Sequence, residues 1–185
     1  MALLRYEDEH GSLPPAIVHG KDGQPLYSWR VLLLPYVEED ELYAQFHLDE
    51  PWDSEHNLPL LSRMPHTYKA PWTREVDVPP HHTVVHVFVG PGTPFESNQK
   101  IRLKDFKDGR SNTLLFVEAG KPVPWTKPEE LTFDPKHPIQ LQGLFRNGFR
   151  AGMADGGRRY VARDTASAFL RKAITHSGGE IADFP

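Results

Sequence analysis

Proline and glycine interrupt this chain along its whole length. There are 18 prolines and 14 glycines among 185 residues, which is about 17% of the chain against a usual share of about 12%. Both residues destabilise the interior of a helix, proline most strongly. The composition therefore disfavours a helical bundle and favours a turn-rich β or α+β fold.

Local patterns predict helices at the two ends of the chain. Residues 2–10 have helical apolar spacing that ends at Gly11, and residues 166–175 form an amphipathic pattern. A third helix is predicted at 28–34, which Pro35 would kink or end. Alternatively, this segment is part of a helix-loop-helix that runs on to Phe46, with residues 38–46 as its second helix and acidic residues in its first turn.

Strands are predicted in the second half of the chain. The β-branched and aromatic runs at 83–89 and 112–118 indicate two of them, and a hairpin is expected from 145–154 and 158–162. Its turn is Asp155-Gly156-Gly157, which suits a backbone with positive φ. The proline-rich residues 49–80 are predicted to form a long irregular excursion across the surface. We therefore expect a single α+β domain over residues 1–185.

Charge is distributed unevenly along the sequence. The formal net charge is −4, but residues 1–60 carry twelve acids and three bases, and residues 145–175 carry seven bases and two acids. Two interpretations are open: attraction between two surfaces within one fold, or head-to-tail association of subunits. A nucleic-acid partner is not expected, because the net charge is negative and the basic segment holds few aromatic residues.

Metal, cofactor and catalytic signals are weak. The chain has no cysteine, which excludes disulfides, thiolate metal sites and cysteine nucleophiles. On a strand, His82 and His86 would lie about 13 Å apart, too far for one ion. The acidic loop 49–55 lacks the order of a calcium loop, so a solvated loop is favoured while Ca²⁺ binding there stays open. No catalytic motif is present; we expect no cofactor, no metal and no enzyme activity, with a hydrolase as the remote alternative.

Three tryptophans are candidate ligand-binding residues. Trp52, Trp72 and Trp125 lie in proline-rich segments, where indole rings either stack on a glycan or hold loops against the core. The second interpretation is favoured. A binding module for a glycan or another extracellular ligand is therefore the alternative function.

Several short motifs, in order along the chain, resemble a known family. They are Gly11–Ala16 (GSLPPA), Ser28–Tyr36 (SWRVLLLPY), Leu48–Asn57 (LDEPWDSEHN), Asp108–Thr113 (DGRSNT) with Glu118-Ala119, Val123–Pro128 (VPWTKP), Met153–Gly156 (MADG), and Ala173–Thr175 with Gly178–Glu180. Each is weak alone. Together they resemble a large paralogous bacterial family with a prepilin-type leader and a domain of unknown function that carries an H-x9-DG motif.

The resemblance implies a fold and a role. The fold would be pilin-like or pseudopilin-like, similar to type II secretion subunits, with residues 1–10 as the remnant of an N-terminal stalk helix on an antiparallel sheet. The family has no established enzyme activity or catalytic residues, so no catalytic residue is carried over. The implied partners are other pilin-like subunits or envelope proteins. The implied location is the cell envelope, in the periplasm or at the surface.

The sequence departs from the family pattern in two ways. Phe145 stands ten residues before Asp155, where the motif has histidine, so Asp155 and Gly156 are expected to have a structural role, as are Asp108, Gly109 and Asn112. The sequence as written also shows no leader and no apolar run of the roughly 18 residues that a membrane span needs. We therefore expect a soluble chain that does not insert into a membrane.

Overall fold

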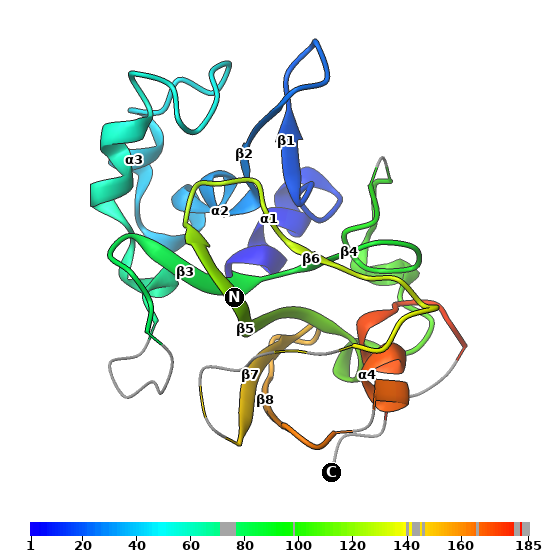
Figure 1. The fold of residues 1–185 in the computed structure, drawn as a ribbon. Coiled ribbons are helices and arrows are strands. Elements are labelled where there is room, and N and C mark those ends of the chain that lie inside the picture. Colours follow the sequence, from blue (N-terminus) through cyan, green and yellow to red (C-terminus); the bar gives the residue numbers. More distant parts are fainter. Residues whose placement is uncertain are drawn as a thin grey trace.

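The fold is described from a computed structural model (Figure 1). It describes residues 1–70, 77–97, 99–139, 141, 145, 147–165, 167–179 and 182. The α-helices in this part are α1 (Ala2–His10), α2 (Trp29–Leu32), α3 (Asp40–Tyr43) and α4 (Ser167–Ile174). The strands are β1 (Ile17–His19), β2 (Pro25–Ser28), β3 (His82–His86), β4 (Phe88–Val89), β5 (Leu114–Pro124), β6 (Leu131–Thr132), β7 (Gly148–Met153) and β8 (Arg158–Ala162). Short 3-10 helices lie at Leu34–Val37, Leu58–Arg63, His66–Tyr68, Leu103–Asp105 and Arg110–Asn112.

An antiparallel sheet with the strand order β3-β5-β7-β8 is the centre of the described part. Successive side chains of a strand point to opposite faces, although a register shift between Leu114 and Phe116 interrupts that alternation in β5. Leu115 and Phe116 pack in the same apolar cluster as Leu3 of α1. Leu114 and Val117 belong instead to the cluster that contains the buried side of α4. The sheet is therefore a layer between α1 and α4.

The hairpin of β7 and β8 forms where the sequence predicts it. Its register pairs Arg150 with Tyr160 and Gly152 with Arg158. Gly156 in the turn has φ 90°, a conformation that L side chains rarely adopt. The prediction of an α+β fold with an antiparallel sheet and a short C-terminal helix is confirmed.

The predicted strand 83–89 is wrong as a single strand. In the structure it is two: β3 pairs with β5 in the large sheet, whereas β4 pairs in parallel with β6. The break is at Val87, whose backbone N–H donates to a carboxylate oxygen of Glu130 at 3.0 Å. Because the Val87 N–H is bonded to a side chain, it is not available for a hydrogen bond to a neighbouring strand. The chain therefore stops pairing with β5 at this residue and pairs with β6 after it.

The N-terminal half differs from the predicted helices mainly in length. α1 ends at Gly11, which has φ 72°, as predicted. α2 ends at Leu32, and Pro35 lies in the following 3-10 helix. The second helix of the alternative helix-loop-helix is present as α3, but it is shorter than residues 38–46. Its late start follows from Glu38, which has φ 65° and cannot continue a right-handed helix.

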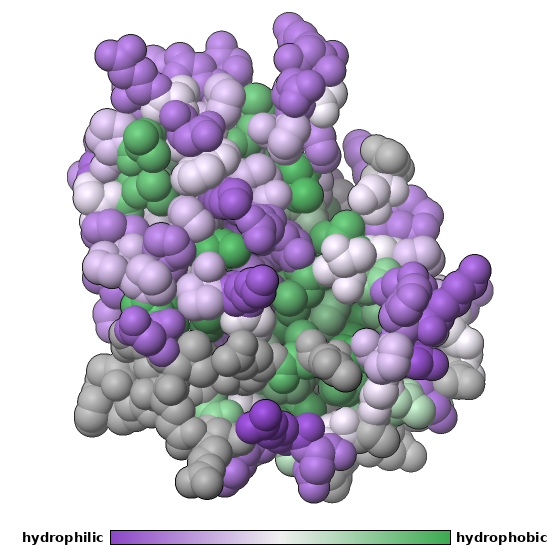
Figure 2. Space-filling model, viewed as in Figure 1, coloured by the Kyte–Doolittle hydropathy of each residue, from purple (hydrophilic) through white to green (hydrophobic). Residues whose placement is uncertain are grey.

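The predicted surface excursion 49–80 is described for residues 49–70 and 77–80, and the part up to residue 70 is less superficial than predicted. Residues 58–63 and 66–68 form 3-10 helices, and Met64 and Tyr68 are buried in an apolar cluster around Trp125. Apolar side chains of α3 and β2 complete this cluster, so the segment covers the core of the upper half of the molecule (Figure 1). In the same view, hydrophilic residues cover the upper end of the molecule, and apolar residues are visible at the surface below them (Figure 2).

Candidate functional site

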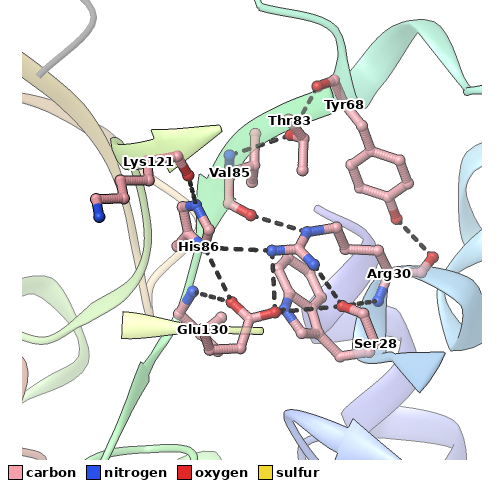
Figure 3. Close-up of polar contacts among 10 residues, drawn as sticks. Ser28, Arg30, Tyr68, Thr83, Val85, His86, Lys121 and Glu130 are labelled. Atoms are coloured by element: carbon pink, nitrogen blue, oxygen red, sulfur yellow. Dashed lines mark hydrogen bonds and ion pairs between the residues drawn. The ribbon is translucent and has the colours of Figure 1, made fainter. Parts of the chain in front are cut away.

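A buried ion pair joins the two halves of the chain. Arg30 of α2 and Glu130, just before β6, lie 2.9 Å apart, and their side chains are 0% and 1% exposed (Figure 3). The Arg30 guanidinium also donates to the Val85 carbonyl at 2.9 Å and to the Ser28 hydroxyl at 2.6 Å. Burial lowers the pKa of Arg30, and the charge of Glu130 opposes that shift.

Glu130 accepts from several donors besides Arg30. The Ser28 hydroxyl and the Trp29 indole N–H donate to one carboxylate oxygen at 3.2 and 3.0 Å. The Val87 N–H donates to the other oxygen at 3.0 Å. One carboxylate therefore connects α2, β2 and Val87, the residue between β3 and β4.

His86 completes this network from β3. Its Nε2 lies 2.9 Å from the Lys121 carbonyl, which only accepts, so Nε2 carries the proton. Its Nδ1 lies 3.5 Å from both Arg30 and Glu130 (Figure 3). The ring is 2% exposed, so it has no route to a substrate from solvent.

The chemistry of this cluster is structural. The Glu130 carboxylate accepts from several donors inside the protein and lies 2.9 Å from the Arg30 guanidinium. These contacts connect segments that are far apart in the sequence. Sequence reasoning missed the cluster. Its local signal is an arginine between Trp29 and Val31 in an apolar run, which is unusual for a buried segment.

The predicted motif residues Asp108, Gly109 and Asn112 lie in one turn, which contacts the segment that follows α4. Asp108 is 4% exposed, and its two carboxylate oxygens accept from the Gly178 and Gly179 N–H groups at 2.7 and 2.8 Å. The Asn112 amide donates to the Asp108 carbonyl, while Gly109 has φ 91°. The structure thus brings Asp108, from one of the family motifs, into contact with Gly178 and Gly179, from another.

Asp155 and Gly156 lie far from that contact, in the β7-β8 turn. The Asp155 carboxylate accepts from the Gly157 N–H at 2.8 Å, and the Gly156 N–H donates to the Met153 carbonyl. Asp155 itself is exposed. These are the interactions of a tight turn, and the structural role expected for Asp155 and Gly156 stays a prediction.

Of the three candidate tryptophans, the structure describes Trp52 and Trp125, and both belong to one apolar cluster. Trp125 is fully buried, and its indole N–H donates to the Leu61 carbonyl. It is a core residue and presents no ring face to a ligand. Trp52 is half-buried against the same cluster, and Trp72 lies outside the described residues.

The acidic loop 49–55 is organised by a buried asparagine. The Asn57 amide donates to the His47 and Pro51 carbonyls and accepts from the His47 N–H, at 2.9 to 3.0 Å. Glu50 at the loop pairs with His47 at 2.9 Å. Within the described ranges, no group of three or more histidine and acidic side chains is arranged to hold a metal ion.

The chain is an α+β domain in which a buried ion pair, Arg30 with Glu130, connects α2 with the residue before β6. A family model described as SBP_bac_10, protein of unknown function (DUF1559), matches residues 1–94. The chain belongs to this family. No curated protein and no solved structure matches it. In the part of the chain that the structure describes, no helix is long and apolar enough to cross a membrane.

Proposed function

We propose that the protein is a non-enzymatic, pseudopilin-like component of the cell envelope that acts through contacts with other copies or related subunits. The observation that carries this proposal is the placement of charge. The acidic residues of the N-terminal third include exposed Asp22, Asp40, Asp49 and Asp53. They lie around the β1-β2 turn, α3 and the following loop, at the upper end of the molecule (Figure 1).

The basic surface lies at the opposite end. Arg158, Arg159 and Arg163 are exposed on or beside β8, which is the edge strand of the large sheet and lies at the lower end in Figure 1. Tyr160 on the same strand is 54% exposed. Attraction between the two surfaces within one molecule is weak at this separation, because salt screens exposed charges beyond about 8–10 Å. Complementary ends instead suit a head-to-tail contact between subunits.

The pseudopilin-like part of the proposal is supported by the fold and by the family. A helix at the N-terminus packs its apolar side on an antiparallel sheet, as the resemblance implies, and the family match covers that helix. Cell fractionation of the source bacterium tests the location: recovery with the envelope supports the proposal, and recovery in the cytosol alone contradicts it.

Charge reversal at the basic end is expected to weaken self-association. The double substitution Arg159→Glu and Arg163→Glu should raise the dissociation constant about tenfold or more at low salt, since each reversal replaces an attraction of roughly 1 kcal/mol by a repulsion. Sedimentation velocity at about 20 mM and 500 mM salt measures this directly. The wild-type association should weaken over the same salt range.

A matched control separates a local contact from a change in net charge. Lys104→Glu also reverses an exposed base but lies outside residues 145–175, so it should leave the association unchanged. Two results would contradict the head-to-tail model. One is a dissociation constant that changes neither with salt nor with the arginine reversals. The other is a protein that stays monomeric at millimolar concentration.

A further inference from the structure

The two edges of the large sheet differ in what covers them. At the β3 edge, the Val85 N–H donates to the Thr83 hydroxyl at 3.1 Å, and the Val85 carbonyl accepts from the Arg30 guanidinium at 2.9 Å. Side chains therefore occupy the backbone groups of Val85. The other edge is β8, where four of the five residues are exposed (Figure 1). Of the described segments, only β7 pairs with β8, so this edge is the open one.

The backbone groups of β8 alternate between β7 and the open edge. The register of the two strands runs without a shift. At its two ends, the Arg163 N–H donates to the Asn147 carbonyl, and the Met153 N–H donates to the Gly157 carbonyl. Residues opposite each other in an antiparallel pair are hydrogen-bonded at every second position, so the odd-numbered residues of β8 bond to β7. The residues that direct their backbone groups away from β7 are Arg158, Tyr160 and Ala162.

Tyr160 lies at the centre of the open edge. On one side of it, the Arg158 carbonyl accepts from the Arg159 guanidinium at 3.2 Å. On the other side, the Ala162 carbonyl accepts from the Thr165 N–H at 3.1 Å. Neither contact uses an outward N–H group or reaches Tyr160, whose side chain is 54% exposed. Outward N–H and carbonyl groups on an edge strand form a template for an added strand.

Arginines flank this edge on both faces of the sheet. Side chains alternate along a strand, so Arg159 and Arg163 share the face of buried Val161, while Arg158 shares the other face with Tyr160. All three arginines are exposed. Pairing of β8 with β8 of a second copy would bring the arginines of both chains together, and like charges on neighbouring strands are destabilising. An acidic strand would instead place carboxylates beside them.

We propose that β8 takes an acidic, extended segment of another polypeptide as a fifth strand of the large sheet. Backbone hydrogen bonds to Arg158, Tyr160 and Ala162 hold the segment, and its carboxylates pair with the arginines beside it. The proposal rests on the proposed function for the basic end as a contact surface, and it adds the mode of binding.

Isothermal titration of the full chain at about 20 mM salt tests this proposal. The probe is acetyl-Glu-Thr-Val-Phe-Glu-Glu-amide, in which strand formers separate the acids. It is compared with two derivatives methylated on alternate backbone nitrogens and with one methylated on every backbone nitrogen. The N–H groups of a strand point alternately to its two edges. Each alternate derivative therefore keeps one free edge, and at least one of them should bind within about threefold of the probe. The fully methylated peptide has no free edge and should bind at least tenfold more weakly.

Two further measurements locate the contact. A probe with lysine in place of each glutamate should bind at least tenfold more weakly, and so should the original probe with Arg159→Gln and Arg163→Gln. Lys104→Gln, which alters an exposed base in another segment, should change nothing. Hydrogen exchange of the Tyr160 amide should slow when the probe binds, whereas the Val161 amide, which already faces β7, should change little.

Three results would overturn the proposal. The first is the absence of binding by the unmodified probe up to about 1 mM, which would mean that the arginines only protect the edge from pairing. The second is equal affinity for the unmodified and fully methylated peptides, which would reduce the contact to charge. The third is binding that leaves exchange at Tyr160 unchanged.

The same experiments separate this proposal from the head-to-tail model. Salt-sensitive self-association of a chain that binds all methylated peptides alike would leave the head-to-tail model standing and remove the added strand. Binding that depends on the peptide N–H groups, by a chain that stays monomeric at millimolar concentration, would do the reverse.

Discussion

Replacing Glu130 with glutamine is expected to lower the free energy of unfolding by about 3–5 kcal/mol, because removal of one partner leaves the other as an unpaired buried charge. The Arg30 side chain is 0% exposed, so water cannot replace the lost carboxylate. The Trp29 and Val87 donors would also face a weaker, uncharged acceptor. Urea denaturation followed by circular dichroism measures the change, seen as a lower midpoint with an unchanged slope.

The neighbouring acid provides a matched control. Glu129 pairs with Lys127 at the surface, where the two side chains are 50% and 41% exposed. Glu129→Gln should therefore cost less than about 1 kcal/mol. The pair Arg30→Met with Glu130→Gln should cost less than the sum of the single changes, since no lone charge remains. A Glu130→Gln protein as stable as the Glu129→Gln protein would show that the buried pair does not hold the fold.

The elements predicted correctly from the sequence are those fixed by local backbone chemistry. α1 ends at Gly11 and the β7-β8 hairpin turns at Gly156, because both residues adopt positive φ and the sequence shows glycine where a turn needs it. β5 was predicted from its apolar and β-branched run. It extends beyond residue 118 to Pro124, through weaker strand formers that the pairing with β3 holds in place.

The features that were missed depend on contacts between distant residues. Arg30 and Glu130 are separated by a hundred positions, and nothing near either one shows that the other is present. The same contact divides the predicted strand 83–89, because Glu130 takes the N–H of Val87. A pattern of residues within one strand carries no information about a carboxylate that lies 43 residues further along the chain.

For the candidate sites too, the sequence indicates single residues but not their distant partners. The resemblance singled out Asp108 and Gly109, and a structural role was expected for them, but their partners at Gly178 and Gly179 appear only in the folded chain. Glu118 was quoted only as part of a family motif. Among the described residues, its carboxylate oxygen Oε2 is buried without a hydrogen-bond partner, and strand periodicity does not predict this.

Replacing Asp108 with alanine is expected to release the segment that follows α4 and to destabilise the fold by about 3 kcal/mol. Its carboxylate accepts two backbone N–H groups at 2.7 and 2.8 Å, and hydrogen bonds to a charged acceptor are worth about 1.5–3 kcal/mol each. Asp108→Asn should lose most of the same stability, because an amide offers one oxygen to two donors. Denaturation midpoints give the size of both effects.

Hydrogen exchange shows where that stability is lost. The Gly178 and Gly179 amides should exchange faster in Asp108→Ala than in the wild type, while amides of β5 should change only as far as global stability does. Asp105→Asn is the control, since Asp105 is 40% exposed and pairs with an exposed arginine, and it should cost less than about 1 kcal/mol. Unchanged exchange at the two glycines would mean that the C-terminal segment is held by the apolar contacts of α4, and that Asp108 does not fasten it.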